Sequence, residues 1–226
     1  LFRSAVPEIP VVLTGAMRSS NELGSDGVYN YLSALRVASN DKAADKGVLV
    51  VMNDQIHAAK YVTKTHTTNV ATFHTPTHGP LGIIMKHDIL WFKTAEPRVR
   101  FDLQQISGTV PIIKAYAGMG IGDGIISLLD PEKIDGVVIE ALGAGNLPPL
   151  AAREITSLMN KRVPVVLVSR CFNGIAEPVY AYEGGGVKLQ EAGVMFVKEL
   201  NAPKARLKLL IALSAGLEGQ ELKDYI

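Results

Sequence analysis

Cysteine is almost absent from this chain of 226 residues, which carries Cys171 alone. One cysteine forms no internal disulfide, and the count by itself leaves the redox compartment open. Long hydrophobic runs are also missing from the sequence. Apolar stretches such as VVLTGAM, GVLVVMN and VPVVLV are far shorter than the roughly 20 residues that a membrane-spanning helix needs. We therefore expect no membrane as a partner.

The chain also lacks a large net charge. It has 23 Lys and Arg residues and 22 Asp and Glu residues, which gives a formal net charge of +1. Proteins that bind nucleic acid usually show a basic face, so we expect no nucleic-acid partner. The opening stretch LFRSAVPEIP has no signal-peptide pattern and runs at once into an apolar strand. We interpret the chain as a fragment of a longer protein and expect a cytoplasmic location, with any signal peptide belonging to the part upstream.

Apolar runs of strand length alternate along the chain with segments of helical periodicity. The predicted strands are VVLTGA (11–16), GVLVVMND (47–54), VPIIKAYAGM (110–119), GVVIEALG (136–143) and VPVVLVSRC (163–171). The predicted helices are the segment after SDG (25–27), then 123–130, 147–161 and 201–216. Continuous apolar strands are typical of burial on both faces. Their alternation with helices predicts an α/β fold of doubly wound, mostly parallel sheets.

Two units are expected from this pattern. The segment LGIIMKHDILWFK (81–93) breaks the rhythm and predicts a hairpin with KHD as its turn, and the polar stretch 94–109 is typical of an interdomain linker. The first unit then covers 1–93 with an incomplete sheet, and the second covers 110–226. Ligands of open α/β sheets bind beyond the carboxyl ends of the strands, so the loops that follow the strands are the candidates for function.

One of these loops, KYVTKTHTTNVATFHTPTHG (60–79), contains seven threonines, three histidines and two lysines. His74 and His78 are four residues apart, but the prolines and glycine around them predict a turn, and cysteine or acidic ligands are missing nearby. We therefore expect no metal site and keep a metal protein only as a third hypothesis. Lys64 is the other candidate. Burial by its neighbours would lower the pKa of such a lysine towards neutrality, although a solvated loop lysine is the simpler interpretation.

Three further features have plain structural interpretations. GIGDG (120–124) lacks the spacing of a dinucleotide-binding loop and predicts a tight turn between a strand and a helix. Cys171 ends an apolar strand in a different unit from the histidines, so we expect a buried, inert thiol rather than a nucleophile. Asp26 in SDG is suited to capping the helix that follows, and capping or a role as a buried structural acid accounts for it.

Several stretches, taken in order, resemble the bacterial-type L-asparaginase/glutaminase family. They are VVLTGAMR with SDGVYN (11–30), GVLVVMNDQI with YVTKT and TF (47–73), HGPLG (78–82), GAGN (143–146), SR with NG (169–174) and LNAPKARLKLLIAL (200–213). The resemblance implies hydrolysis of the side-chain amide of asparagine, sometimes of glutamine, without a metal or an organic cofactor. The chain departs from the family pattern in lacking the T-G-G-T motif of the threonine nucleophile and the H-G-T-D motif of a second threonine and an aspartate.

The resemblance implies a role for five residues of this chain. Lys64 matches the catalytic lysine, which pairs with the aspartate and activates the second threonine. Ala16 matches a residue whose backbone lies beside the substrate, and Asn146 matches an asparagine that reaches into the active site of a neighbouring subunit. The acid that binds the substrate amine corresponds either to Glu177, the nearest carboxylate, or to the position of Tyr180, which leaves the preference for asparagine or glutamine open.

The resemblance also implies a homo-oligomer, a dimer of dimers, with active sites between units of different chains. Because the chain lacks the nucleophile, and loss of a nucleophile costs several powers of ten in rate, we expect it to be inactive by itself. The competing hypothesis is a non-catalytic α/β module that binds a small amino acid or a partner subunit. The sequence upstream would decide between the two.

Overall fold

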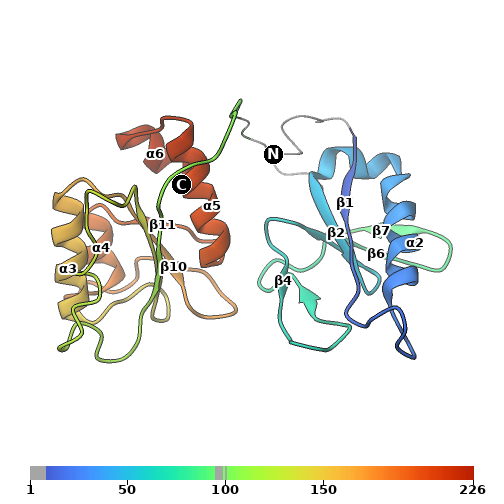
Figure 1. Cartoon of the computed structure of the whole chain (residues 1–226), viewed down its shortest axis with the longest axis horizontal. Helices are drawn as coiled ribbons and strands as arrows, with labels where there is room; N and C mark the ends of the chain where they lie inside the picture. The colour runs from blue at the N-terminus through green and yellow to red at the C-terminus, as the bar shows by residue number, and fades with distance from the viewer. Residues whose placement is uncertain (1–8, 95–98, 100) are drawn as a thin grey trace. The chain divides into compact units, whose positions relative to one another are not determined.

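The structure is a computed structural model that describes residues 9–94, 99 and 101–226. It divides into two compact units, Leu1–Arg100 and Phe101–Ile226 (Figure 1). Of the predicted linker 94–109, residues 95–98 and 100 lie outside the described residues. The prediction of an α/β fold with two units is confirmed, and each unit builds its own sheet and its own core.

In the described part of the first unit, the main sheet has the strand order β1-β2-β3-β6-β7. Its strands are β1 (Val11–Leu13), β2 (Val48–Met52), β3 (Gln55–Ala58), β6 (Gly82–Ile84) and β7 (Ile89–Trp91). β1 and β2 pair in parallel, and the other pairs are antiparallel. The predicted hairpin at 81–93 is confirmed as β6 and β7, with the KHD residues in its turn.

β3 is a strand that the apolar pattern does not predict. Asn53 and Asp54 have φ angles of 48° and 60°, so the chain reverses directly after β2 instead of continuing to residue 54. Positive φ at both central residues is typical of the two-residue turns that join antiparallel strands, and asparagine and aspartate tolerate it better than most residues. β3 then pairs with β2 along its whole length and places His57 opposite Val50.

α2 (Gly27–Ala38) is the helix predicted after SDG, and the 3-10 helix η1 (Asp41–Lys46) follows it. Tyr31, Leu32 and Leu35 recur at helical spacing and form an apolar stripe on α2, and all three are exposed. The residues that α2 buries are Asn30, Ser33, Ala34 and Val37. Ala34 and Val37 join the apolar core of this unit, while Asn30 makes hydrogen bonds that organise the loops beyond β1 and β2.

The second unit has a parallel sheet with the strand order β11-β10-β9-β8 in its described residues. The strands are β8 (Ile112–Lys114), β9 (Val137–Ala141), β10 (Val165–Ser169) and β11 (Met195–Phe196). Successive residues of β10 alternate between two cores, Val165 and Leu167 in one and Val166 and Val168 in the other. This is the period of two expected for a strand buried on both faces.

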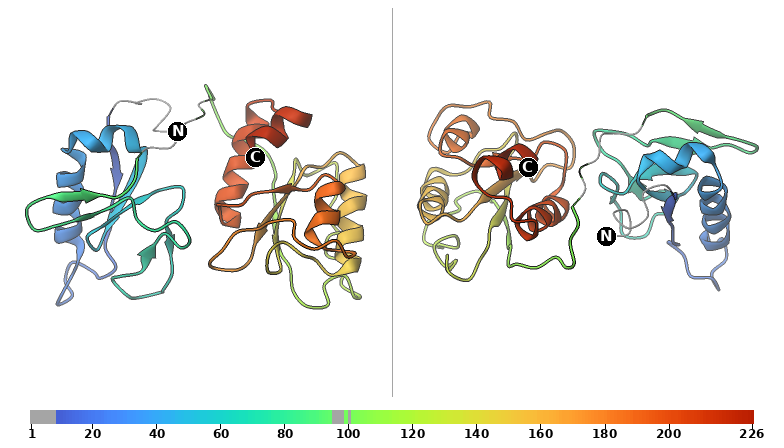
Figure 2. Two further views of the ribbon diagram at one scale, coloured as in Figure 1. Left: turned by 180° about the vertical axis from the view of Figure 1, so that it is seen from behind. Right: turned by 90° about the horizontal axis from the view of Figure 1, so that it is seen from above.

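Helices cover both faces of this sheet (Figure 2). They are α3 (Pro149–Asn160), α4 (Gly186–Glu191), α5 (Ala202–Ser214) and α6 (Gly219–Tyr225). Residues of α3 and α4 belong to one core, and residues of α5 and α6 belong to the other. α5 begins as predicted, because the Asn201 side chain accepts a hydrogen bond from the Lys204 N–H. Gly216, with a φ of 76°, follows its end.

The predicted helix at 123–130 is wrong, because the segment forms turns. The glycines of GIGDG have positive φ angles, which break the helical path, and Pro131 follows directly. Asp123 accepts hydrogen bonds from the Tyr116 O–H at 2.5 Å and from the Gly120 N–H at 2.9 Å, which closes the turn that GIGDG predicts. α4, β11 and α6 are short elements that the sequence pattern does not predict.

Candidate active site

The loop after β1 carries Ala16 and is held by Asp26. The Met17 N–H donates to both carboxylate oxygens of Asp26, at 3.0 and 3.1 Å, and the Arg18 N–H donates to Oδ1 at 3.0 Å. Asp26 stands at the N-cap position of α2, but its side chain makes no capping hydrogen bond. The expectation of a helix cap is therefore wrong, and the alternative interpretation as a structural acid applies.

The electrostatics of Asp26 agree with this arrangement. Burial alone would raise its pKa, but the backbone N–H groups of Arg18 and Met17 and the Asn30 amide together hold the pKa of Asp26 below its ordinary value. A charged Asp26 thus fixes the backbone on the C-terminal side of Ala16. Ala16 itself is exposed at the carboxyl end of β1, where ligands of such sheets bind.

Asn30 links this loop to the end of the neighbouring strand. Its Nδ2 donates to the Gly15 carbonyl at 3.0 Å, and its Oδ1 accepts from the Asn53 N–H at 3.0 Å. Asn30 is only 1% exposed, and both hydrogen bonds are partly buried, so the loss of its side chain would lower stability. The geometry of the loops after β1 and β2 therefore depends on one buried side chain.

Lys64 lies on β4 (Thr63–Lys64), which pairs with β5 (Phe73–His74) outside the main sheet. Lys64 stands opposite Phe73 and is exposed. Among the described residues, the neighbours of Lys64 therefore do not bury its side chain, so the burial that the sequence suggested is not found there. The amine of Lys64 is therefore accessible from solvent.

The histidines of the first unit have different environments. His57 is fully buried on β3, and its Nδ1 lies 2.9 Å from the Thr75 Oγ1. Burial and the neighbouring His74 lower the pKa of His57 to about 4, against a smaller opposing effect of the Phe73 backbone. Residues 9–94, 99 and 101–226 contain no group of three or more His, Cys, Asp or Glu side chains that could hold a metal ion.

In the second unit, the structure brings Asn146 close to the segment that carries Glu177 and Tyr180. The Asn146 Oδ1 accepts from the Gly186 N–H at 3.3 Å, and the Ala144 carbonyl accepts from the Glu177 N–H at 2.7 Å. A Cβ at position 186 would lie 2.9 Å from the Pro178 Cα, so only glycine allows these segments to approach so closely. The three predicted residues therefore share one loop cluster beyond β9 and β10.

Glu177 and Tyr180 differ in what their side chains contact. The Glu177 Oε1 lies 3.3 Å from the Lys198 Nζ, in an ion pair that is half exposed on both sides. Tyr180 is 50% exposed, and its ring centre lies 5.7 Å from that of Tyr182. Each side chain is thus accessible to a ligand approaching this cluster.

Cys171 corrects one expectation. It is exposed, not buried, because β10 ends at Ser169 and the chain leaves the sheet there. The Cys171 N–H donates to the Ser169 Oγ at 3.0 Å, which turns the backbone outward. The side chain therefore faces solvent instead of the core that packs against β10.

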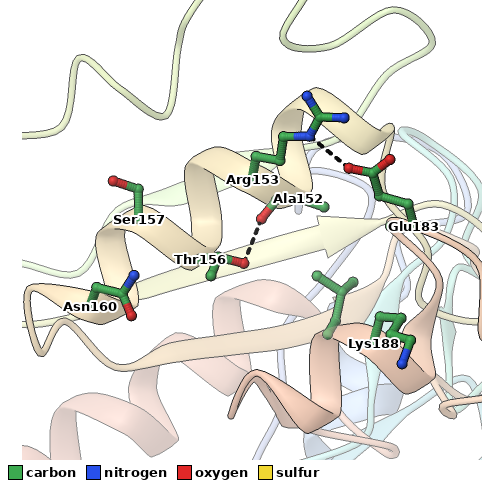
Figure 3. Close-up of a pocket in the computed structure, with 9 residues that line it drawn as sticks. Ala152, Arg153, Thr156, Ser157, Asn160, Glu183 and Lys188 are labelled. Atoms are coloured by element: carbon green, nitrogen blue, oxygen red, sulfur yellow. Dashed lines mark hydrogen bonds and ion pairs between the residues drawn. The ribbon is translucent and has the colours of Figure 1, made fainter.

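A hollow of about 480 Å³ lies elsewhere in this unit, between α3 and the segment 183–189 (Figure 3). Arg153 and Glu183 reach across its rim at 2.6 Å, and the Thr156 O–H donates to the Ala152 carbonyl at 3.0 Å. Lys188 is likewise ion-paired, with Glu191 at 2.7 Å. The lining cations are thus already neutralised, and none of the predicted site residues lines this hollow.

Ala16 and Lys64 thus belong to the first unit, and Asn146, Glu177 and Tyr180 belong to the second. The sequence pattern does not indicate the buried polar residues of the first unit, among them Asn30, His57, Thr72 and Thr75. The spacing of Asp26 and Asn30, four residues apart on a helix, was the available signal, because residues at this spacing are neighbours on one helical face. His57 and Thr75 offered no comparable local signal.

The chain matches two family models over nearly its whole length. Residues 3–97 match the model "Asparaginase, N-terminal", and residues 109–226 match the model "Glutaminase/Asparaginase C-terminal domain". No helix in the described ranges is both long enough and apolar enough to cross a membrane.

Individual relatives agree with the family models. The chain is 41% identical over 219 residues to a probable L-asparaginase of Deinococcus radiodurans, a match that covers 95% of this chain and 66% of that protein. It is 32% identical to an L-asparaginase of Bacillus licheniformis, over 96% of this chain and 66% of the relative. L-asparaginase 2 of Escherichia coli is 31% identical, with 95% and 62% covered. The chain thus spans 62 to 66% of the length of these relatives. On these matches, the chain belongs to the glutaminase/asparaginase family.

Proposed function

We propose that the protein carrying this chain is an amidohydrolase that converts L-asparagine to aspartate and ammonia. The observation that carries the proposal is the match of both halves of the chain to asparaginase domains, together with relatives named L-asparaginase. L-Glutamine is the second substrate to test, since the family description of the C-terminal domain includes glutaminases. The reaction needs neither a metal nor an organic cofactor in this proposal.

Lys64 is the catalytic residue that we assign to this chain. The exposed amine on β4 would pair with an aspartate and receive or return a proton of a threonine hydroxyl. Neither the T-G-G-T nor the H-G-T-D motif occurs in the 226 residues, so the threonine nucleophile and the aspartate would come from outside them. We therefore propose that this chain alone does not turn over substrate.

The substrate would meet residues of both units. We propose that the Ala16 backbone lies beside the substrate, and that Asn146 with Glu177 or Tyr180 contacts it from a neighbouring subunit. The accessible loop cluster beyond β9 and β10 supports this assignment. A homo-oligomer, built as a dimer of dimers, would then be the active form.

The test is ammonia release from L-asparagine and L-glutamine by the purified longer protein that carries this chain, compared with its Lys64→Met variant. We expect kcat of the variant to fall about 10³-fold, as is typical when a proton-transfer group is lost. Lys86→Met is the matched control, because Lys86 is an exposed lysine in the β6–β7 turn, and it should leave kcat unchanged. Absence of asparagine hydrolysis would overturn the proposed activity, and full activity of Lys64→Met would overturn the role of Lys64.

A further inference from the structure

The strand pair that carries Lys64 is too small to be stable by itself. β4 and β5 have two residues each, and their ladder consists of the pairs Thr63–His74 and Lys64–Phe73. They stand apart from the main sheet as a separate two-stranded sheet. Isolated two-stranded hairpins are at best marginally stable in water, so other contacts must keep Lys64 in place.

Threonines close the loop beyond this strand pair. The Thr65 N–H and Oγ1–H donate to the Thr72 carbonyl at 2.8 and 2.9 Å. The Thr72 hydroxyl in turn lies 2.6 Å from both the His66 N–H and the His66 carbonyl, accepting from the first and donating to the second. Thr72 is fully buried. These contacts order the hairpin internally, but they do not attach it to the main sheet.

One attachment is the hydrogen bond of the Val62 N–H to the Ala58 carbonyl of β3 at 3.1 Å, and the side-chain attachment runs through His57 and Thr75. His57 lies on β3 of the main sheet, opposite Val50, and Thr75 follows β5 directly. The His57 Nδ1 and the Thr75 Oγ1 are 2.9 Å apart, and the two residues are 0% and 6% exposed. The chain of contacts therefore leads from the central sheet through Thr75 and β5 to Lys64 on β4.

A buried imidazole lowers the stability of the fold relative to an apolar side chain at the same core position. Its Nε2 has no hydrogen-bond partner among the described residues, and a buried polar atom without a partner lowers stability. Leucine would fill the space without this cost. Stability alone therefore does not account for histidine at position 57, whereas a directional hydrogen bond to the hairpin does.

We propose that His57 and Thr75 are positioning residues for Lys64. Their hydrogen bond holds the β4–β5 hairpin at a defined height and orientation above the main sheet, so that the lysine amine meets its reaction partners in the geometry that proton transfer requires. The inference rests on the proposed catalytic role of Lys64, but the anchoring of the hairpin can be tested separately.

The decisive variant is the double substitution His57→Leu with Thr75→Val. Replacing both partners of a buried hydrogen bond by apolar groups of similar shape is nearly neutral for stability, so folding is retained while the anchor is lost. We expect kcat for asparagine to fall about tenfold with an unchanged KM, because small displacements of a catalytic group slow the chemical step. The single variant Thr75→Ser keeps the hydroxyl, so its kcat should stay within about twofold of wild type.

Hydrogen exchange provides a readout that is independent of catalysis. In the double variant, the amides of Thr65 and His66 should exchange about tenfold faster. Without the hydrogen bond between positions 57 and 75, local opening of the hairpin costs less free energy. The amides of β9 and β10 serve as an internal reference and should not change. Unchanged exchange at Thr65 and His66, or a kcat within about twofold of wild type in a protein where Lys64→Met is inactive, would overturn the inference. An active Lys64→Met variant would instead overturn the proposed function, and the exchange data would still decide the anchoring.

Discussion

Asn30 donates a hydrogen bond from its Nδ2 to the Oδ2 of Asp26, the N-cap residue of α2 four positions earlier, at 2.9 Å. The same amide group also donates to the Gly15 carbonyl, and its oxygen accepts from the Asn53 N–H. One buried polar residue of α2 thus connects the loops at the ends of two strands. This arrangement explains why α2 points Asn30, rather than Tyr31 or Leu32, towards the sheet.

Substitution Asn30→Ala should destabilise the protein by about 2 kcal/mol, because it removes the side-chain hydrogen bonds to the Gly15 carbonyl, the Asp26 carboxylate and the Asn53 N–H. Urea unfolding followed by circular dichroism measures the difference. Asn21→Ala makes the same chemical change in an exposed loop and should stay within about 0.5 kcal/mol of wild type. Equal effects of the two substitutions would show that the Asn30 network contributes nothing measurable.

Stability should decrease as the pH falls from 6.5 towards 4, partly because of His57. Its pKa in the folded chain is about 4, below the ordinary 6.5, so the unfolded chain binds this proton more tightly. The contribution of neutral His57 to the free energy of unfolding is complete above pH 6.5 and is lost as the pH falls towards 4. By linkage it amounts to about 3 kcal/mol.

The measurement for this pH dependence is urea unfolding at several pH values for wild type and for the His57→Leu, Thr75→Val double variant. The difference between the two proteins isolates His57 from the other titrating groups, including the neighbouring His74. We expect the variant to have the shallower dependence. Parallel curves for the two proteins would contradict the assignment to His57.

Glu177 and Tyr180 can be distinguished by kinetics of the protein that carries this chain. We expect Glu177→Gln to raise the KM for asparagine about tenfold, because a carboxylate is the natural partner of the substrate ammonium. The exposed ion pair with Lys198 contributes little and can be exchanged for the substrate. Tyr180→Phe removes only a hydroxyl and should change KM by less than about threefold. The reverse ranking would assign the amine contact to Tyr180.

Cys171 should react with a thiol reagent such as 5,5′-dithiobis(2-nitrobenzoic acid) in the absence of denaturant. Exposure of the side chain is the reason, because the reagent reaches the thiol without unfolding of the chain. Cys171→Ser is the control without a thiol. Reaction that begins only in denaturant would restore the expectation of a buried thiol.

Much of the second unit follows from local sequence. β10 lies within its predicted apolar run 163–171, and α3 begins in the proline-containing turn predicted for 147–161. Such elements are predictable because they are visible in consecutive residues. A strand buried on both faces is a continuous apolar run, and a proline in a helix fits only the first turn. The hairpin at 81–93 is predictable for the same reason, since its turn residues separate two short apolar runs.

Other features depend on contacts that no local pattern records. Aspartate directly before a helix is typical of a helix cap. The Asp26 oxygens instead accept hydrogen bonds from the N–H groups of Met17 and Arg18, which only the tertiary fold brings within reach. The threonines and histidines of 60–79 have no periodicity that distinguishes a solvated loop from an ordered hairpin. His57 and Thr75, separated by 18 positions, meet only because the chain after β3 folds back on itself through the β4–β5 hairpin.

The sequence by itself determined the α/β class, the order of most strands and helices, the resemblance to a family and the choice of Lys64, because these depend on residue type and order along the chain. The tertiary structure alone decided which side chains hold Lys64 and Ala16 in place, and that Cys171 and the apolar stripe of α2 face outward. The physical reason is that burial and hydrogen-bond partners are properties of packing. A buried donor must find its acceptor wherever the fold places one, and that position is set by the whole sheet and not by neighbouring residues.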